Sequence, residues 1–284
     1  MRKISIPRQI VTQLALVAIG FFVILPIWGM VRLAFDGSLM GRPTEFRLLP
    51  KVWAFEPFLR VLDRPYQSVD FLTLLRNSLV VSFGAGLIAI ALGFALAYAF
   101  ARFRFPARQT GLFAILLTAV LPPVAFMTPL YILFSILQIR TSLLALILVY
   151  AAFAMPFCIW NMRAAFQAVP KELEEAAFLD GASDFKTFLY ITLPLALPSI
   201  AVAGLIAFLM AYSEFAMGWF FVDKADNVTL AMSIYAMTQS WGGAQPWSYL
   251  GSLAIIMSIP VVVIFLIFQR ALLERMMFGA ASDS

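Results

Sequence analysis

The chain has 284 residues, of which 63% are hydrophobic and 12% charged, with a formal net charge of +5, no histidine and one cysteine, Cys158. Soluble domains carry roughly 25% charged residues, so most of this surface is not made to face water. The absence of histidine excludes catalytic triads that use it and the commonest transition-metal ligand, and one cysteine excludes an intrachain disulfide or a thiolate metal cage.

Six uncharged runs are long enough to cross a bilayer as helices, which takes about 20 residues. They cover 10–31, 77–101, 109–139, 141–162, 187–213 and 227–269. The last run is too long for one crossing, and Gly242, Gly243 and Pro246 break it, so the sixth helix is expected from about Trp247. Because lipid offers backbone amides no partner, each span must be helical. We therefore predict an all-α integral membrane protein whose six-helix domain covers 10–278.

The positions of Lys and Arg predict the orientation of the chain. These residues are retained on the cytoplasmic side when they lie in short segments near helix ends. With the N-terminal segment 1–9 inside, the cytoplasmic connections hold Arg2, Lys3, Arg8, Arg102, Arg104, Arg108, Arg163, Lys171, Lys186, Arg270 and Arg275. The short outer connections hold Arg140 and Lys224, and a long outer loop, about 36–71, mixes basic and acidic residues. Both termini, including the tail 279–284, are predicted to be cytoplasmic, and these loops explain the net charge without nucleic-acid binding. The first span exceeds the apolar core of a signal peptide and is expected to remain as an anchor.

Residues that disturb a span are the first candidates for a transport pathway. Glu214 is the clearest ionisable residue inside a span, and hydrogen bonding across helices is favoured over an ion site because one carboxylate makes a poor relay. Prolines interrupt several spans, at positions 122, 123, 129, 156, 198 and 260. Three of them lie in the third span, which is the first candidate for pore lining, with packing curvature as the alternative for any single proline.

The connection between the fourth and fifth spans, about 169–194, predicts a short helix that docks on a partner. Pro170 suits the opening of a helix, and Gly181 suits its end. Ser183 is a plausible N-cap of a second short helix that runs toward Pro194. Five acids oppose two lysines between Lys171 and Lys186. A helix lying on lipid headgroups is the alternative, but such helices are usually rich in Lys and Arg.

One face of the first short helix is apolar. Leu173, Ala176 and Ala177 recur at helical spacing, whereas Glu172 and Glu175 share another face. An isolated helix shorter than about 12 residues is marginal in water, so this one needs a surface to dock against. We therefore predict docking to another protein.

The same segment resembles a known motif. Glu175-Ala176-Ala177, three residues, Gly181, nine residues, Ile191, one residue and Leu193-Pro194 match the EAA loop of the membrane-spanning subunits of binding-protein-dependent ABC importers. The resemblance implies the six-helix type I importer permease fold and a coupling helix that sits in a cleft of a cytoplasmic ATPase. The implied coupling residues are Glu172, Leu173, Glu175, Ala176, Ala177, Asp180 and Gly181.

Finer features resemble the carbohydrate branch of that family, in particular the shorter, G-type permease of maltose-type systems. They are Arg76-Asn77-Ser78, Ala97-Tyr98-Ala99-Phe100-Ala101-Arg102, Pro122-Pro123, Pro129-Leu130-Tyr131, Pro156-Phe157, Arg163 and Glu214-Phe215. Ser213 stands where the family usually has Asn, and Tyr212 where it usually has Trp. Thr229-Leu230 lies in an outer loop, about 223–246, that resembles the family's periplasmic scoop. The likeness is weakest across 35–71, which leaves the role of that loop open.

The resemblance implies a transport subunit rather than an enzyme. The chain has no GxxxxGK motif followed by Ser or Thr, so ATP and Mg are expected on a separate ATPase dimer. The other implied partners are a second permease of the F-type, an extracytoplasmic sugar-binding protein and the lipid of a prokaryotic cytoplasmic membrane. No cofactor or metal is expected on this chain. Candidate substrate-pathway residues are Pro122, Pro129, Tyr131, Tyr212, Glu214 and Trp219, and candidate contacts of the binding protein are Thr229 and Leu230.

Three alternatives remain open at this point. A secondary transporter would need more buried ionisable residues, and uptake that depends on ATP rather than on an ion gradient would exclude it. An importer for another solute, such as an osmolyte or amino acid, would share the EAA loop. A membrane scaffold without transport activity would not co-purify with an ATPase.

Overall fold

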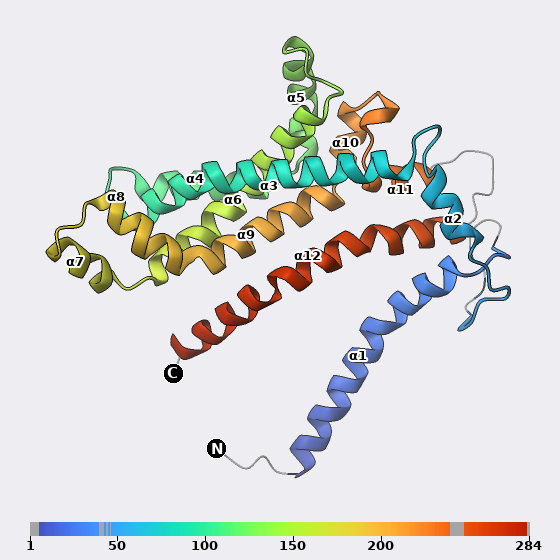
Figure 1. Cartoon of the computed structure of the whole chain (residues 1–284), viewed down its shortest axis with the longest axis horizontal. Helices are drawn as coiled ribbons and strands as arrows, with labels where there is room; N and C mark the ends of the chain where they lie inside the picture. The colour runs from blue at the N-terminus through green and yellow to red at the C-terminus, as the bar shows by residue number, and fades with distance from the viewer. Residues whose placement is uncertain (1–5, 40–42, 44, 46, 239–246, 283–284) are drawn as a thin grey trace. The chain divides into compact units, whose positions relative to one another are not determined.

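A computed structural model describes residues 6–39, 43, 45, 47–238 and 247–282 (Figure 1). Within these ranges the chain forms helices and no strand, apart from isolated bridges that pair Asp36 with Trp53 and Tyr66 with Val69. The predicted breaks at Gly242, Gly243 and Pro246 lie outside the described residues. The side chains beyond Gln269 are likewise not described, which includes Arg270 and Arg275.

Five stretches are long and apolar enough to cross a membrane, and a sixth is a bent pair of helices. The five are α1 (Ile6–Ala34), α3 (Phe71–Arg102), α6 (Leu143–Ala168), the run Asp184–Ser213 and the apolar part of α12 (Trp247–Ser282), which is Trp247–Gln269. The bent pair is α4 (Arg108–Val120) and α5 (Val124–Ile136). With the pair taken as one span, the predicted all-α fold with six crossings is confirmed.

Several helix boundaries differ from the prediction. Helix α3 begins at Phe71 rather than at the predicted residue 77, because Arg76 lies within its second turn and does not stop it. Helix α12 continues through Ser282, so most of the predicted tail 279–284 is helical. Charged residues at the ends of a span stay in the helix when they reach the polar edge of the bilayer, so a cut at every charge shortens each helix.

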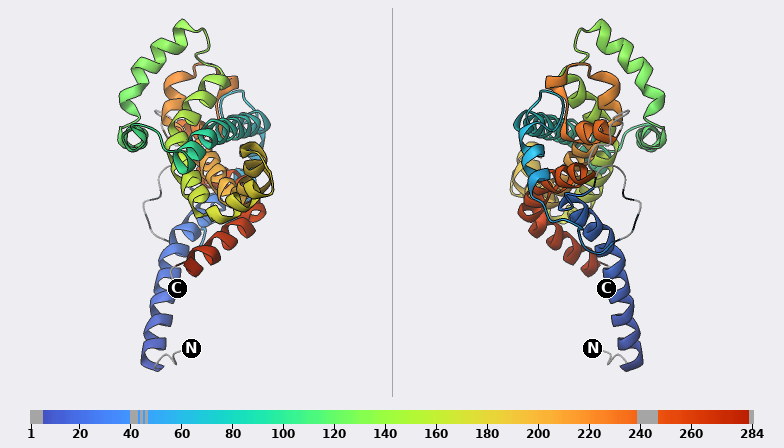
Figure 2. Two further views of the ribbon diagram at one scale, coloured as in Figure 1. Left: turned by 90° about the vertical axis from the view of Figure 1, so that its left-hand side faces the viewer. Right: turned by 90° about the vertical axis from the view of Figure 1, so that its right-hand side faces the viewer.

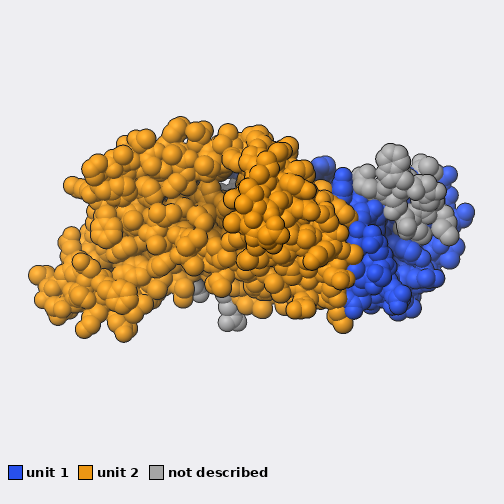
Figure 3. Space-filling model, turned by 90° about the horizontal axis from the view of Figure 1, so that it is seen from above, with its two compact units in different colours: residues 1–71, 234–258 blue, residues 72–233, 259–284 orange. Residues whose placement is uncertain are grey.

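The chain divides into two compact units (Figure 3). The first, called here the N-terminal unit, comprises Met1–Phe71 and Ile234–Ser258. The second, called the core unit, comprises Leu72–Ser233 and Ile259–Ser284.

The core unit is built around α3, α6 and α9 (Leu193–Ser213), and small residues let these helices approach closely (Figure 1). A Cβ at Gly204 would lie 2.4 Å from Cδ1 of Ile90, and one at Gly93 would lie 3.1 Å from the Met162 methyl carbon. Close packing of this kind drives the association of helices in lipid. Lipid tails are as apolar as the side chains, so the hydrophobic effect supplies no driving force there. Cys158 is buried in α6 as a small apolar residue.

The third predicted span is broken rather than merely kinked. Helices α4 and α5 meet at an angle of 95° (Figure 2), and the break covers Leu121, Pro122 and Pro123. Two consecutive prolines supply no N–H to the preceding turn, so the α-helical ladder cannot continue. Pro129 was also expected to interrupt this span, but it lies inside α5.

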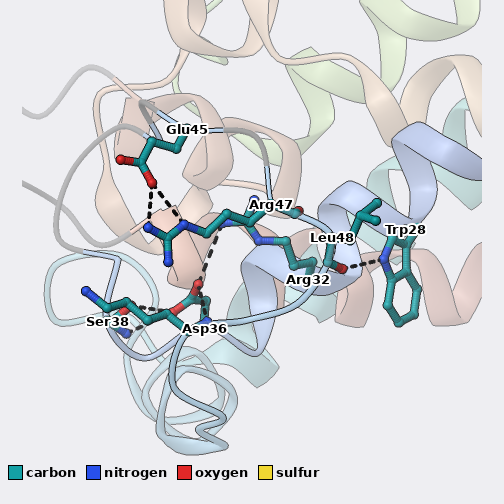
Figure 4. A network of polar contacts seen from close by, with 8 residues as sticks. Trp28, Arg32, Asp36, Ser38, Glu45, Arg47 and Leu48 are labelled. Atoms are coloured by element: carbon teal, nitrogen blue, oxygen red, sulfur yellow. Dashed lines mark hydrogen bonds and ion pairs between the residues drawn. The ribbon is translucent and has the colours of Figure 1, made fainter.

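In the N-terminal unit, the buried carboxylate of Asp36 bonds to described residues of the loop that follows α1 (Figure 4). Oδ1 accepts hydrogen bonds from the Ser38 hydroxyl at 2.6 Å and amide at 3.1 Å, and Oδ2 accepts one from the Lys51 amide at 3.1 Å. Arg32 lies 3.6 Å from Oδ2 and donates to the Arg47 carbonyl at 3.1 Å. The carboxylate thus joins the end of α1 to two points of the loop.

Burial and hydrogen bonding act in opposite directions on the pKa of Asp36. Burial alone would raise the pKa of this carboxyl, but hydrogen bonds from Ser38 and from the Lys51 amide outweigh burial and hold the pKa below its ordinary value. A group with a lowered folded-state pKa stabilises the fold at pH values above its ordinary pKa, and this contribution is lost as the pH falls through the lowered value. At neutral pH the contribution is complete.

We predict that Asp36→Asn loosens the loop without unfolding the helices. The amide cannot accept all of these hydrogen bonds and carries no charge for Arg32, so trypsin should cleave after Arg47 or Lys51 at least fivefold faster at pH 7.5. Asp63→Asn, at an exposed position of α2 (Glu56–Asp63), is the control and should cleave at the wild-type rate. Equal cleavage of both variants would show that the loop does not depend on Asp36.

Candidate functional site

The predicted docking segment forms a short helix and a turn at one end of the core unit (Figure 1). Helix α7 (Lys171–Leu179) begins directly after Pro170 and carries Glu172 and Glu174 in its first turn. Gly181 has a φ of +82°, so the predicted left-handed residue after this helix is confirmed. A side chain there would be strained, which explains why the turn needs glycine.

The second helix of this segment is longer than predicted. Ser183 caps it as expected, because its hydroxyl accepts from the Lys186 amide at 3.4 Å. Helix α8 (Asp184–Thr187) then passes through a π-helical turn, η1 (Phe188–Thr192), directly into α9. Pro194 follows the π turn and lacks the N–H that an α-helical ladder would use, so the spacing changes there without ending the helix.

Glu174 holds α7 against the rest of the core unit. Its Oε1 lies 2.9 Å from Nη2 of Arg102, at the end of α3, and accepts a hydrogen bond from the Thr192 hydroxyl at 2.6 Å. Arg102 also donates to the Val169 carbonyl at 2.9 Å. The Arg102 and Glu174 side chains are 7% and 11% exposed. We call Arg102, Val169, Glu174 and Thr192 the Glu174 cluster.

Aromatic rings fix the same end of the unit. Tyr98 of α3 packs on Phe166 of α6 and on Phe188 of η1, with ring centroids 5.4 and 4.5 Å apart. Phe94 lies 5.5 Å from Phe188. Because these rings join three helices beside the Glu174 cluster, α7 is connected to the bundle by both a charge pair and packed apolar surface.

A groove of about 610 Å³ runs between α3 and α7. Residues of the aromatic contacts and of α7 line it, among them Tyr98, Phe178, Phe188, Glu175 and Lys171. Both charged and aromatic residues line this groove.

The buried and exposed faces of α7 differ from the predicted ones. Glu174 and Ala177 face the core unit, whereas Ala176 is exposed, Leu173 is half-exposed and Leu179 is 89% exposed. Ala177 was expected to contact a partner, but the chain itself covers it. The surface available to a partner comprises Glu172, Leu173, Glu175, Ala176 and Leu179, which we call the exposed face of α7.

Sequence reasoning missed Glu174, Arg102 and Thr192 as site residues. A run of three acids, at 172, 174 and 175, does not reveal which carboxylate is buried. The usable signal was that Glu174 and Ala177 are three residues apart and share a face, while Arg102 ends an apolar span with no acid near it in the sequence.

A second candidate region surrounds Glu214, the residue after α9. Its two carboxylate oxygens accept from the Met217 amide at 2.9 Å and the Gly218 amide at 3.3 Å, at the start of α10 (Ala216–Phe221). Glu214 thus bonds to the amides that open α10, and the Tyr150 hydroxyl of α6 also lies close to its carboxylate. Glu214 also lines a cavity of about 520 Å³, together with Pro123, Tyr150 and Phe157.

Three aromatic residues predicted for the pathway have other surroundings. Tyr131 lies under the Arg140 guanidinium, 4.7 Å from it, and packs on Phe220. Tyr212 stacks on Phe208 at 5.5 Å, and the Trp219 indole donates to the Met232 carbonyl at 3.0 Å. None of the three lines the cavity beside Glu214.

The residues predicted to touch a binding protein are buried. Thr229 is 4% exposed and Leu230 is 0% exposed. The backbone amide of Leu230 donates to the Ser78 hydroxyl at 2.8 Å, and the side-chain amide of Asn77 donates to the Val228 carbonyl at 2.9 Å. Asn77 and Ser78 of α3 therefore hold this segment inside the core unit. This burial argues against direct contact of the Thr229 or Leu230 side chain with a partner.

Comparison with known proteins gives consistent matches. Residues 72–278 match the family described as "Binding-protein-dependent transport system inner membrane component". The Trehalose transport system permease protein SugB of Mycobacterium tuberculosis is 30% identical over 253 residues, which cover 83% of this chain and 92% of that protein. The Trehalose/maltose transport system permease protein MalG of Thermococcus litoralis is 27% identical over 275 residues, or 96% of each chain.

A solved structure shares the fold. One chain of a bacterial ABC transporter involved in the import of the acidic polysaccharide alginate superposes with a TM-score of 0.74 at 20% identity, covering 95% of this chain and 99% of that chain. The match extends over the N-terminal and core units alike.

We predict that Glu174→Gln destabilises the protein strongly, whereas Glu172→Gln does not. Loss of the charge leaves Arg102 buried without its counterion, which costs about 3–5 kcal/mol when one partner of a buried pair is removed. Glu172 is exposed, and surface substitutions usually change stability by less than about 0.5 kcal/mol. Thermal unfolding of the detergent-solubilised protein should separate the two variants. Similar unfolding temperatures would show that the Glu174 cluster adds no stability.

Proposed function

The chain belongs to the family of inner membrane components of binding-protein-dependent transport systems, and from this premise we propose that it is one of two permease subunits of an ATP-driven sugar importer. The relatives that span nearly its whole length are named for trehalose and maltose transport, which supports a sugar or oligosaccharide as the substrate. The chain is a transport subunit, and a separate subunit hydrolyses ATP.

The observation that carries the proposal is the construction of α7. Its exposed face presents two acids and apolar side chains outward, while the Glu174 cluster holds its other face against α3 and η1. A force on the exposed face would therefore reach two membrane helices through short, buried contacts. In this proposal Glu172, Leu173, Glu175 and Ala176 contact the ATPase, and Ala177, Asp180 and Gly181 set the shape of the helix and its turn.

The proposed assembly has four kinds of component. This chain pairs with a second permease of the F-type, two ATPase subunits hold ATP and Mg, and an extracytoplasmic binding protein delivers the sugar. A conformational change needs different contacts in its two states, and closure of the ATPases on the exposed face of α7 supplies that difference. The two permeases then alternate between outward-open and inward-open states.

The charge pattern supports an orientation with α7 and both termini in the cytoplasm. Lys and Arg concentrate in the connections that would then lie inside the cell, as expected for a multi-pass protein of a prokaryotic cytoplasmic membrane. The loop 36–71 and the segment 223–246 would lie outside. Burial of Thr229 and Leu230 leaves neighbouring exposed residues of that segment as better candidates for contact with the binding protein.

The proposed sugar pathway follows the broken third span. Non-helical backbone at membrane depth is tolerated where it lines a cavity or is buried in protein, and Leu121 and Pro123 of the break line the cavity beside Glu214, whereas Pro122 does not. Pro129, Tyr131, Tyr212 and Trp219 support the walls from positions outside the cavity.

We predict that Glu175→Lys and Gly181→Pro leave membrane insertion intact but uncouple ATP hydrolysis from uptake. The first reverses a charge on the exposed face of α7. The second places proline at a position whose φ of +82° proline cannot adopt. In proteoliposomes containing the complete complex, sugar uptake should fall at least tenfold while ATP hydrolysis persists.

The matched control is Asp63→Lys, a charge reversal at an exposed position of α2. It should retain wild-type uptake. Normal uptake by both α7 variants would overturn the coupling role, and failure of any ATPase to co-purify with the wild-type chain would overturn the importer itself.

A further inference from the structure

We propose that the cavity beside the α4–α5 break is a binding subsite for a neutral sugar, in which Glu214 and Tyr150 bind hydroxyl groups and Phe153 and Phe157 pack against the sugar ring. The inference rests on the proposed function and extends it, because it assigns direct sugar contacts to this permease rather than to its partner alone.

The cavity has the size and wall of a small-molecule site. Its volume of about 520 Å³ lies within the range of roughly 300–1,000 Å³ that ligand pockets occupy. Tyr150, Phe153 and Phe157 line it from α6, and their spacing of three and four residues places them on one face of that helix. Met127 of α5 and Met217 of α10 also line it. Such a wall suits the apolar C–H face of a sugar ring.

Two polar groups converge on this apolar wall. Each Glu214 oxygen accepts one backbone amide and retains a lone pair, since a carboxylate has about four acceptor sites. The Tyr150 hydroxyl is buried, since its residue is 3% exposed, and it lies close enough to this carboxylate to interact with it. A sugar hydroxyl placed between the two groups would donate to the carboxylate and accept from the Tyr150 O–H.

The broken helix adds a backbone acceptor. The carbonyl of Ala119, whose residue lines the cavity, would receive the N–H of residue 123 in a continuous helix. Pro123 has no N–H and cannot donate to this carbonyl, so in the proposed subsite the carbonyl accepts from a sugar hydroxyl. Sugars are rich in such donors, whereas lipid tails have none.

The charges of the cavity select the class of sugar. Glu214 is the one ionisable acid among its lining residues, and no Lys or Arg lines it. A single carboxylate is a poor cation site, and among the described residues no group of three acids or cysteines is placed to hold a metal. An acidic sugar would meet the negative charge of Glu214 without a basic partner. Neutral sugars are therefore the expected occupants.

The first test measures uptake of trehalose and maltose in proteoliposomes that contain the complete complex and its binding protein. Tyr150→Phe and Phe157→Leu should each lower sugar accumulated per ATP hydrolysed at least fivefold, while ATP hydrolysis stimulated by the binding protein stays within twofold of wild type. Cys158→Ala, on the same helix but outside the cavity, should match the wild type in both.

The second test detects occupancy directly. In the cysteine-free Cys158→Ala chain, Met127→Cys places a thiol in the cavity wall, and Ile132→Cys places one on the same helix outside it. During turnover, trehalose or maltose should slow maleimide labelling at position 127 at least threefold and leave position 132 unchanged.

The outcomes distinguish failure of the proposed subsite from failure of the proposed importer function. Wild-type yields in both cavity variants, or labelling at 127 that neither sugar slows, would overturn the subsite while leaving the importer intact. Equal losses of uptake, ATP hydrolysis and co-purified ATPase would assign the residues a structural role and also overturn it. A wild-type chain that co-purifies with no ATPase would overturn the proposed function, and the subsite would fall with it.

Discussion

The structure depends first on one buried carboxylate, that of Glu174, which an arginine from α3 and a threonine from η1 share. A helix of nine residues is unstable by itself, and a charged side chain is costly to bury without partners. Arg102 offsets both effects. It neutralises the buried charge, and its second hydrogen bond, to the Val169 carbonyl, fixes the chain that enters α7. The result is a short helix that is held against the bundle.

The second constraint is that lipid offers the backbone no hydrogen bonds. Most spans satisfy their backbone hydrogen bonds as continuous helices. In η1 the hydrogen bonds change to π-helical spacing, so the helix continues without a break. The third span does not, since Pro122 and Pro123 end α4 and turn the chain by 95°. Leu121 and Pro123 of this break line the cavity beside Glu214, so the break forms part of the cavity wall.

Much of this architecture was predictable because it follows from local rules. Hydropathy and length located the spans, and the left-handed turn at Gly181 followed from the residue itself. What failed depended on contacts between distant segments. Nothing local indicates that Glu174 faces inward, or that Leu230 is buried because its amide bonds to Ser78, which lies 152 residues earlier. Nothing local indicates either that Tyr212, a substrate-pathway candidate, stacks on Phe208.

The central claim is that the Glu174 cluster transmits force from α7 to the membrane helices. The most direct test is a double-mutant cycle on the ratio of sugar accumulated to ATP hydrolysed, with Arg102→Ala, Glu174→Ala and the double variant in proteoliposomes. If the two residues act as one connection, each single variant lowers the ratio about tenfold and the double variant lowers it no further. Single variants that keep the wild-type ratio, or losses that multiply in the double variant, would contradict the claim.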